Sequence, residues 1–503
     1  MNCKKVSRIA ALLLAALMLG TACSEKPTAA AEGGTAAGTQ DAQTAVENNA
    51  SEANEPEAEE EYDPFADLPD TTWDGRSFHL LAREMYLYEL WTEAMTGDAF
   101  NDAVYERNAA VEQRYDVKIE AIPIAGEWAN RDTFITAVRS SIQANDGAYD
   151  LIDGYAATIG EGFGSGLYMN LREVPNLRLE KDWWSALLRD ELTVNGRLFA
   201  ITGDLAVNLW EQMQVIFFNK PLLTDFQLDS PYDMVLDGTW TYDAYLSMIA
   251  GHSLDADGDG TMTDADRYGA LYYDQLTFDN LHNAFDVRLT KRGADGSVEL
   301  DVFNEQIVKI GEMAYDLAYN NPDVYSLGGV VGDTREPCRQ MFTEGKGLFF
   351  ASVLEDAGLM RDMDADFGIL PYPKWNESQS EYHTTSRDGR SMFTIPIDTP
   401  DAAFSGLIAE ALCVEGNRRV IPVFYDKVLK GKNARDEQSG RMLDIIRAGL
   451  VLDFAAEYAV QTGRAGFIIR DSIAEQKDIA SFYASKQKVF DVSFQKFLKA
   501  YYE

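Results

Sequence analysis

The chain has 503 residues, enough for two or three domains, and 46% of them are hydrophobic, as in a globular protein with a large core. Its formal net charge is −38, from 44 Lys and Arg against 82 Asp and Glu. Nucleic-acid binding needs a basic face, and docking on anionic lipid needs clustered positive charge, so this balance argues against both.

The first 23 residues combine a basic start, an apolar stretch and a cysteine that follows small residues. Basic residues precede an apolar stretch of about a dozen residues, which suits a signal peptide better than a membrane-spanning helix. The segment from Leu19 to Cys23 then resembles a lipobox, although Gly20 stands where leucine is commoner. We expect residues 1–23 to be a signal peptide and Cys23 to carry a lipid that holds the protein at the outer face of the cytoplasmic membrane. The alternative is an ordinary secretory signal.

Residues 24–70 are predicted to form a disordered acidic tether. Up to residue 62 the segment is rich in Ala, Glu, Thr and Gly and has almost no large apolar side chain. Such a segment cannot bury enough surface to offset the loss of chain entropy on folding.

The N-terminal apolar stretch is the one segment that suits a membrane, which excludes a transporter with several spans.

An alternation of strands and helices begins near residue 75. The pattern predicts strands at 76–82, 117–124 and 149–152, and helices at 101–115 and 134–142. This order favours a parallel sheet with helices on its faces. Ligands of such sheets sit beyond the carboxyl ends of the strands, which here are Arg83-Glu84 and Asp153-Gly154-Tyr155.

A second alternating region begins near residue 215. It comprises expected strands at 215–219, 348–350 and 367–370, an expected helix at 241–250, and a helical C-terminus whose aromatic residues share one face. Two α/β lobes fit this length better than one oversized domain.

Several short motifs follow one another along the chain: Asn101–Asn108, Val194–Phe199 with Gly203-Asp204, Phe217–Lys220, Gly238–Thr241, Phe342–Gly347, Gly368–Pro373 and Lys430–Asp444. In this order they resemble the extracellular solute-binding lipoproteins of bacterial ABC importers, of the carbohydrate-binding family 1 type. The resemblance implies an α/β, two-lobed periplasmic-binding-protein-like (type II) fold with hinge strands and a ligand cleft. It implies chain crossings near 203–210 and 366–372, so that lobe 1 comprises 71–205 and 367–430, and lobe 2 comprises 206–366 and 431–503.

Residues 255–266 have the spacing of a twelve-residue EF-hand-type calcium loop. Calcium needs several oxygen ligands that converge on one point, and Gly260 stands where such a loop turns sharply. Position 12 carries aspartate where glutamate is commoner, so we expect weak affinity and a structural Ca²⁺. The expected ligands are Asp255, Asp257, Asp259, the carbonyl of Thr261, and Asp266. The alternative is an acidic turn without a metal.

A sugar-binding cleft would combine flat aromatic rings with polar side chains. Tyr155 directly follows a strand, whereas the other candidates flank the two crossings or follow the strand at 348–350. The candidate contacts are Tyr155, Asp204, Trp210, Glu211, Ser352, Glu355, Tyr372, Trp375 and Arg387. We expect Trp183, Trp184 and Trp240 to be structural, and Cys338 and Cys413 to be two separate buried thiols.

The leading hypothesis is the substrate-binding component of an ABC importer, a monomer that captures an oligosaccharide or other carbohydrate, presents it to the permease subunits and performs no chemistry. The alternatives are a surface glycan-active enzyme, which would need a spaced pair of carboxylates, and a calcium-stabilised adhesion or scaffold lipoprotein. The acidity of the chain disfavours a polyanionic glycan, although a locally basic cleft or calcium would reverse that expectation.

Overall fold

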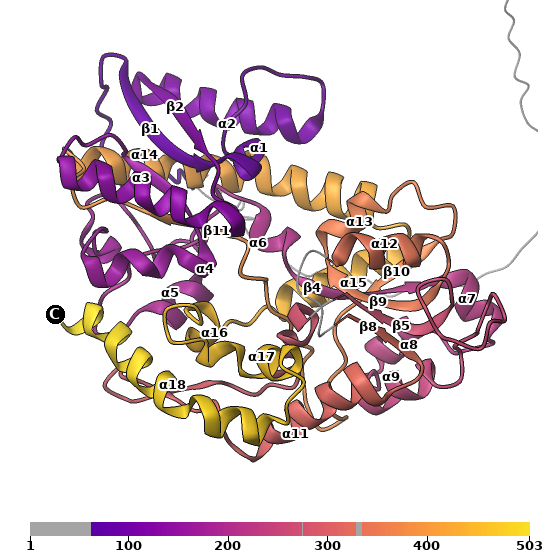
Figure 1. Ribbon diagram of the computed structural model, residues 1–503. Helices are drawn as coiled ribbons and strands as arrows, with labels where there is room; N and C mark the ends of the chain where they lie inside the picture. The colour runs from indigo at the N-terminus through magenta and orange to yellow at the C-terminus, as the bar shows by residue number, and fades with distance from the viewer. Residues whose placement is uncertain (1–61, 274, 328–333) are drawn as a thin grey trace, which may run out of the picture. The chain divides into compact units, whose positions relative to one another are not determined.

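Two mixed sheets organise the folded part of the chain, which the computed structural model describes over residues 62–273, 275–327 and 334–503 (Figure 1). Residues 63–503 form one unit. The predicted signal peptide, Cys23 and residues 24–61 of the predicted tether lie outside the described residues. The end of that tether differs from the prediction, because Phe65 and Leu68 are buried in the core of the first lobe.

The first lobe is built on a four-stranded sheet in the order β11-β3-β1-β2. Its strands are β1 (Arg76–Arg83), β2 (Val117–Ile124), β3 (Leu151–Tyr155) and β11 (Ser391–Thr394). The three N-terminal strands run parallel, as their strand–helix alternation predicts, and β11 adds antiparallel to β3. Their carboxyl ends therefore lie at one edge of the sheet.

The second lobe contains a five-stranded sheet in the order β10-β4-β9-β5-β8. Its strands are β4 (Gln214–Asn219), β5 (Tyr268–Tyr272), β8 (Val324–Ser326), β9 (Gly347–Val353) and β10 (Phe367–Leu370), and the hairpin of β6 (Thr290–Arg292) and β7 (Val298–Leu300) is separate. The predicted boundary put residue 367 in the first lobe. The structure instead pairs β10 with β4, so the chain returns to the first lobe after this strand, within 371–390.

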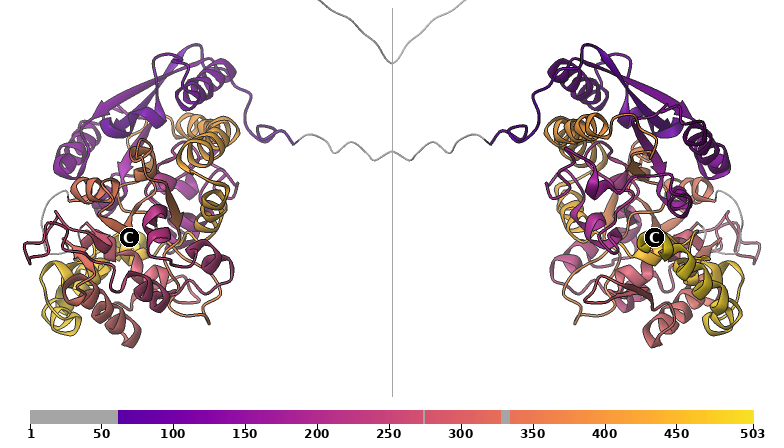
Figure 2. Two further views of the ribbon diagram at one scale, coloured as in Figure 1. Left: turned by 90° about the vertical axis from the view of Figure 1, so that its right-hand side faces the viewer. Right: turned by 90° about the vertical axis from the view of Figure 1, so that its left-hand side faces the viewer.

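The helices around the first sheet are mostly those of the N-terminal third. They are α1 (Leu87–Leu90), α2 (Ala99–Tyr115), α3 (Arg131–Ala144), α4 (Ala156–Ile159), α5 (Ala186–Leu192) and α14 (Ala402–Glu415). Asp98 begins α2 by accepting the amide hydrogens of Phe100 and Asn101. Helix α14 lies alongside α2, as Figures 1 and 2 show. The short α6 (Asn208–Glu211) stands where the chain first crosses between the lobes.

The remaining helices belong mainly to the second lobe. They are α7 (Lys220–Asp225), α8 (Pro231–Leu236), α9 (Tyr242–Ile249), α10 (Asn280–Ala284), α11 (Glu305–Tyr315), α12 (Arg335–Thr343), α13 (Glu355–Leu359), α15 (Glu437–Ala448), α16 (Phe454–Glu457), α17 (Ile468–Ala474) and α18 (Ile479–Tyr502). Among the described residues, none of the helices combines the length and the hydropathy that crossing a membrane requires.

Helix α18 joins the two lobes, which differs from the prediction that 431–503 belongs wholly to the second. Its first half packs Phe482 and Phe490 into the core of the second lobe, whereas Phe494, Phe497 and Tyr501 enter the core of the first. In Figure 1 the helix accordingly runs from beside α11 towards the first lobe. Lobe membership thus changes within one uninterrupted helix.

Several structural expectations are confirmed. Cys338 and Cys413 are buried free thiols. The indole nitrogens of Trp183 and Trp184 donate to the two carboxylate oxygens of the buried Glu410, at 2.8 and 2.7 Å. Trp240 is fully buried, and its indole N–H donates to the carbonyl of Pro371 at 3.0 Å. These side chains belong to the cores of the two lobes.

Candidate functional site

A cleft of about 790 Å³ lies where the two lobes and the crossing segments meet. Each of the strands β1, β2, β3 and β5 is followed, at or near its carboxyl end, by residues that line it. The lining residues are Arg83, Met85, Tyr86, Glu127, Trp128, Ala129, Tyr155, Gln212, Tyr273, Leu276, Arg335, Glu355, Arg387, Asp388, Gly389, Arg464 and Arg470. This volume falls within the range of small-molecule sites, about 300–1,000 Å³.

The wall formed by the first lobe is aromatic. Trp128 is 47% exposed and meets Tyr155 edge to face, with ring centroids 6.3 Å apart. The guanidinium of Arg83 lies over the rings of Tyr86 and Tyr155, at 4.4 and 5.4 Å. Arg83 itself is held by the carbonyl of Gly389 and other buried groups. The wall therefore offers flat apolar faces on a fixed support, which suits the C–H faces of sugar rings.

The wall formed by the second lobe is charged. Arg335 on α12 makes a 3.0 Å ion pair with Glu355 on α13, and Gln212 donates to the same carboxylate at 3.4 Å. Behind this pair the buried Asp356 accepts from Arg339 and from the hydroxyl of Ser352. The sequence-predicted Ser352 therefore acts as a support for the wall, and its side chain does not line the cleft.

Two guanidiniums from the C-terminal part of the chain, Arg464 and Arg470, form a third part of the lining, which we call the base of the cleft. Arg470 makes a two-pronged ion pair with Asp279 through Nε and Nη2, and Arg464 makes one with Asp471 at 2.7 and 2.6 Å. Both guanidiniums also lie against the ring of Phe467. Burial raises the pKa of Asp279 to about 6, although Arg470 opposes the shift. The base is therefore a pair of fixed cationic groups.

A small polar chamber of about 40 Å³ adjoins the base and shares Arg387, Asp388 and Arg470 with the cleft. Four of its buried lining residues each have one polar atom that no described group satisfies: Asn283 Oδ1, Ser386 Oγ, Arg390 Nε and Glu457 Oε1. Buried polar atoms are normally hydrogen-bonded to protein, ligand or ordered water. The chamber therefore suits ordered water or a small hydroxyl-bearing group.

Three of the nine sequence-predicted contacts line the cleft: Tyr155, Glu355 and Arg387. Tyr155 lies there because it is the last residue of β3, and its position at the end of a predicted strand is what identified it in the sequence. Arg387 lies on the segment that returns from the second lobe, and its amide donates to the carbonyl of Gln212 at 2.8 Å. The two crossing segments therefore contact each other at this point.

Two predicted contacts near the first crossing, Asp204 and Trp210, do not line the cleft. Asp204 accepts a hydrogen bond from Asn417 at 2.7 Å, and its burial raises its pKa to about 7. Trp210 packs under the guanidinium of Arg447, at 4.7 Å. Both residues therefore take part in interactions inside the protein.

Three more predicted contacts also lie outside the lining. Glu211 accepts from the hydroxyl of Tyr88, and burial raises its pKa to about 7, while the next residue, Gln212, faces the cleft instead. The buried Tyr372 donates to the carbonyl of Thr277 at 3.2 Å. Trp375 packs edge to face on Phe285, with ring centroids 5.3 Å apart.

Most of the lining residues were missed by the sequence reasoning. Tyr86, Trp128 and Tyr273 follow β1, β2 and β5 closely, so the strand-end signal that found Tyr155 would have found them. Arg464 and Arg470 carry no such signal, because they reach the cleft from the segment before and within α17.

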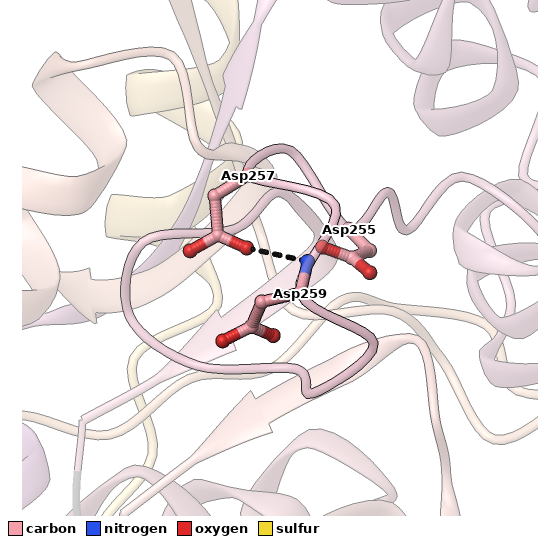
Figure 3. Close-up of side chains that lie close together, drawn as sticks. All are labelled: Asp255, Asp257 and Asp259. Carbon is pink, nitrogen blue, oxygen red and sulfur yellow. Dashed lines mark hydrogen bonds between the residues drawn. The ribbon is translucent and has the colours of Figure 1, made fainter.

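The loop at 255–266 lies between α9 and β5, and none of its residues lines the cleft. Carboxylate oxygens of Asp255, Asp257 and Asp259 lie within 4.8 Å of one another (Figure 3). Asp266 is fully buried, and its oxygens accept the amide hydrogens of Ala256 and Thr263 at 2.8 and 2.7 Å. These bonds, first that from Thr263, hold the pKa of Asp266 below its usual range. Three like charges therefore converge on a loop closed by a fourth carboxylate.

Solved structures of sugar-binding proteins share this fold. A cyclo/maltodextrin-binding protein complexed with maltotetraose is 11% identical, with a TM-score of 0.56 over 84% of this chain and 98% of that chain. An ABC substrate-binding protein from Listeria monocytogenes in complex with cycloalternan is 12% identical, with a TM-score of 0.52 over 85% and 99%. An ABC transporter solute-binding protein from Thermotoga lettingae bound with α-D-tagatose is 14% identical, with a TM-score of 0.53 over 83% and 100%.

No protein-family model matches the sequence. No curated protein is similar to it at a significant level. The structural likeness nevertheless confirms the fold that the sequence resemblance implies: the chain has the two-lobed α/β fold of the solute-binding proteins of ABC transporters.

Proposed function

We propose that this protein is the extracellular substrate-binding component of an ABC importer and that it captures an oligosaccharide between its lobes. The observation that carries the proposal is the cleft of about 790 Å³, which combines an aromatic wall at Trp128 and Tyr155 with a charged wall opposite. Residues from both lobes and from both crossing segments line it. A ligand bound there stabilises the closed arrangement because it contacts both lobes at once.

The protein performs no chemistry in this proposal. Aromatic faces bind the apolar sides of the sugar rings, and charged side chains bind their hydroxyls. Closure buries the ligand, and the closed form is the one that the permease subunits of the importer recognise. One copy of the chain is sufficient for capture.

Anchoring belongs to the same proposal. Residues 1–23 serve as the signal peptide, and the lipidated Cys23 holds the protein at the outer face of the cytoplasmic membrane while the segment after it acts as a tether. Replacement of Cys23 by serine is expected to release the protein into the medium. Retention of that variant in the membrane fraction, without incorporation of labelled fatty acid, would contradict the lipid anchor.

We further propose that residues 255–266 bind a structural Ca²⁺. The convergence of Asp255, Asp257 and Asp259 supports it, because a cation removes the repulsion between three carboxylates. The carbonyl of Thr261 and the carboxylate of Asp266 complete the ligand set in this scheme. The ion would fix the loop that precedes β5, and it plays no direct part in ligand capture.

The experiment that tests capture is a thermal-shift screen of the chain from residue 24 onward against a panel of oligosaccharides. A bound ligand at about 100 times its Kd stabilises the fold by about 2.7 kcal/mol. A saccharide that raises the Tm and is recovered intact supports the proposal. Tyr155→Ala is expected to abolish the shift, whereas Tyr502→Ala, on an exposed residue at the end of α18, retains it. A cleaved saccharide would instead favour an enzyme, and no shift with any saccharide would refute capture.

A further inference from the structure

Among the charged residues that line the cleft, basic residues outnumber acidic ones, which is the reverse of the balance in the whole chain. Of the described residues that line it, five are arginine, none is lysine and three carry a carboxylate: Arg83, Arg335, Arg387, Arg464 and Arg470 against Glu127, Glu355 and Asp388. The whole chain has 82 acidic against 44 basic residues. An excess of one sign of charge on the wall of a cleft favours ligands of the other sign.

Acidic partners beside or behind the wall hold the guanidiniums in place. Asp279 holds Arg470, Asp471 holds Arg464, and Asp153 lies 3.5 Å from Nε of Arg83. Such pairs reduce the freedom of long side chains, so that less entropy is lost when a ligand binds. Where such a pair uses only one edge of the guanidinium, the other edge stays available to a ligand.

Arg464 and Arg470 have this one-sided arrangement. Each uses its Nε and Nη2 edge for its aspartate, and Nη1 of neither forms a hydrogen bond with any described residue. The side chain of Arg464 is 45% exposed, and that of Arg470 lines both the cleft and the polar chamber. Both guanidiniums lie against the ring of Phe467, at 5.0 and 3.6 Å from its centroid, so one ring connects the two cations.

The backbone at Arg464 is strained. Its φ of +72° lies in the left-handed region, where non-glycine residues are uncommon. Eight other non-glycine residues of the described chain share this feature, so the geometry at Arg464 matters here for the choice of variants and does not by itself mark a ligand site.

We propose that the ligand is an acidic saccharide whose carboxylate or sulfate group is bound by Arg464 and Arg470 at the base of the cleft, while its sugar rings lie towards Trp128 and Tyr155. This inference rests on the proposed function and names its substrate class. Guanidinium forks match carboxylate and sulfate oxygens in charge and geometry, and such hydrogen bonds are about twice as strong as neutral ones. A neutral saccharide would offer these two guanidiniums only uncharged hydroxyl oxygens, which form weaker hydrogen bonds.

The test compares matched ligands by isothermal titration calorimetry on the chain from residue 24 onward. The probes are tetrasaccharides of galacturonate and of galactose, and one sulfated disaccharide beside its desulfated form. We expect at least one acidic member to bind about tenfold or more tightly than its neutral partner, the effect of about one charge-assisted hydrogen bond. A separate preference for the uronate or for the sulfate identifies which anion is bound.

The variants Arg464→Gln and Arg464→Gly sharpen the test. Both remove the guanidinium, and the glycine also relieves the left-handed backbone, so a loss of affinity common to both cannot come from strain. We expect each to reduce the preference for the acidic ligand about tenfold, while Arg361→Gln, on a 66% exposed side chain outside the cleft, keeps it. Melting curves of each variant verify that it is folded.

Neutral ligands that bind as tightly as their acidic partners would overturn this inference and leave saccharide capture in place. The inference is overturned in the same way if Arg464→Gln lowers affinity for both ligand types equally. If no saccharide of either type binds the folded protein, the proposed function fails, and this inference fails with it.

Discussion

The cleft and the loop at 255–266 differ in how their charged side chains are paired. At the cleft, charges of both signs come from segments up to 387 residues apart, Arg83 and Arg470 being the extremes, and most are paired at hydrogen-bond distance. In the loop, three carboxylates from five consecutive residues converge without a described basic partner. The charges of the cleft are therefore largely balanced by other side chains, whereas the loop carboxylates accept only backbone amide hydrogens from described residues and would gain from the proposed Ca²⁺.

This difference has consequences for stability and binding. A change in a cleft pair should disturb both properties, because the pair supports the fold and lines the site. A change in the loop should disturb only stability, and only when calcium is present. Three sets of variants test this separation, and a fourth tests the pH dependence of a buried residue outside both regions; they follow in order of decreasing effect.

The largest effect is expected from breaking the buried pair at the base. Asp279→Asn leaves Arg470, whose side chain is 9% exposed, with only the more distant Asp388 at 3.5 Å. Loss of one partner of a buried pair costs about 3–5 kcal/mol because the remaining charge is uncompensated. Urea denaturation should therefore show a fall of about that size. Asp362→Asn, on a 94% exposed side chain, is the control. Equal midpoints for both variants would mean that solvent or Asp388 compensates Arg470.

The next effect concerns calcium. Stabilisation is expected to reach about 2.7 kcal/mol when the free ion is at about 100 times its Kd, and extracellular modules have Kd values of about 10⁻⁴–10⁻³ M. Asp257→Ala should abolish the difference in Tm between calcium and chelator, while Asp264→Ala, in the same loop but outside the cluster, retains it. Saccharide affinity should stay unchanged in both. A calcium effect that survives Asp257→Ala would place the ion elsewhere.

The same contrast explains what the sequence could predict. The predicted ligands of the loop lie within twelve residues, so their spacing was visible in the sequence, and the structure brings three of them together. The strands were equally local: the predicted 117–124 and 367–370 coincide with β2 and β10. The pairing of β10 with β4 and the passage of α18 between lobes were not predictable, because both depend on contacts between distant segments.

The cleft residues also differ in whether a local sequence pattern or a contact between distant segments determines their position. Tyr155 was found because a strand ends there, a local signal. Tyr372 satisfied a similar rule but turns inward, because its hydroxyl reaches the carbonyl of Thr277 in the core. Arg464 and Arg470 lie in a segment with no strand beside it, and they acquire their position only when the C-terminal helices pack against the crossing segments.

A smaller effect is expected from pH. Burial raises the pKa of Glu211, beside the first crossing, from the usual 4.5 to about 7. The folded protein therefore keeps a proton that the unfolded chain releases above about pH 4.5, so the free energy of unfolding falls as pH rises from there to about 7. Glu211→Gln should remove about 1–3 kcal/mol of that fall. The measurement is urea denaturation between about pH 4.5 and 8. Glu93→Gln, on an exposed residue, should keep the full slope.

The smallest effect is expected at the rim of the cleft, where binding and stability separate most cleanly. Trp128 is 47% exposed and packs mainly on Tyr155 and Arg131. Trp128→Ala should weaken saccharide binding by about 0.5–1.5 kcal/mol through loss of an aromatic face, while the free energy of unfolding changes by about 0.5 kcal/mol or less. Trp128→Phe should recover part of the affinity, because it restores a flat ring. Calorimetry and urea denaturation on the same samples measure both quantities. An unchanged affinity in Trp128→Ala would mean that the ligand lies deeper, on the guanidiniums alone, and would remove the aromatic wall from the binding site.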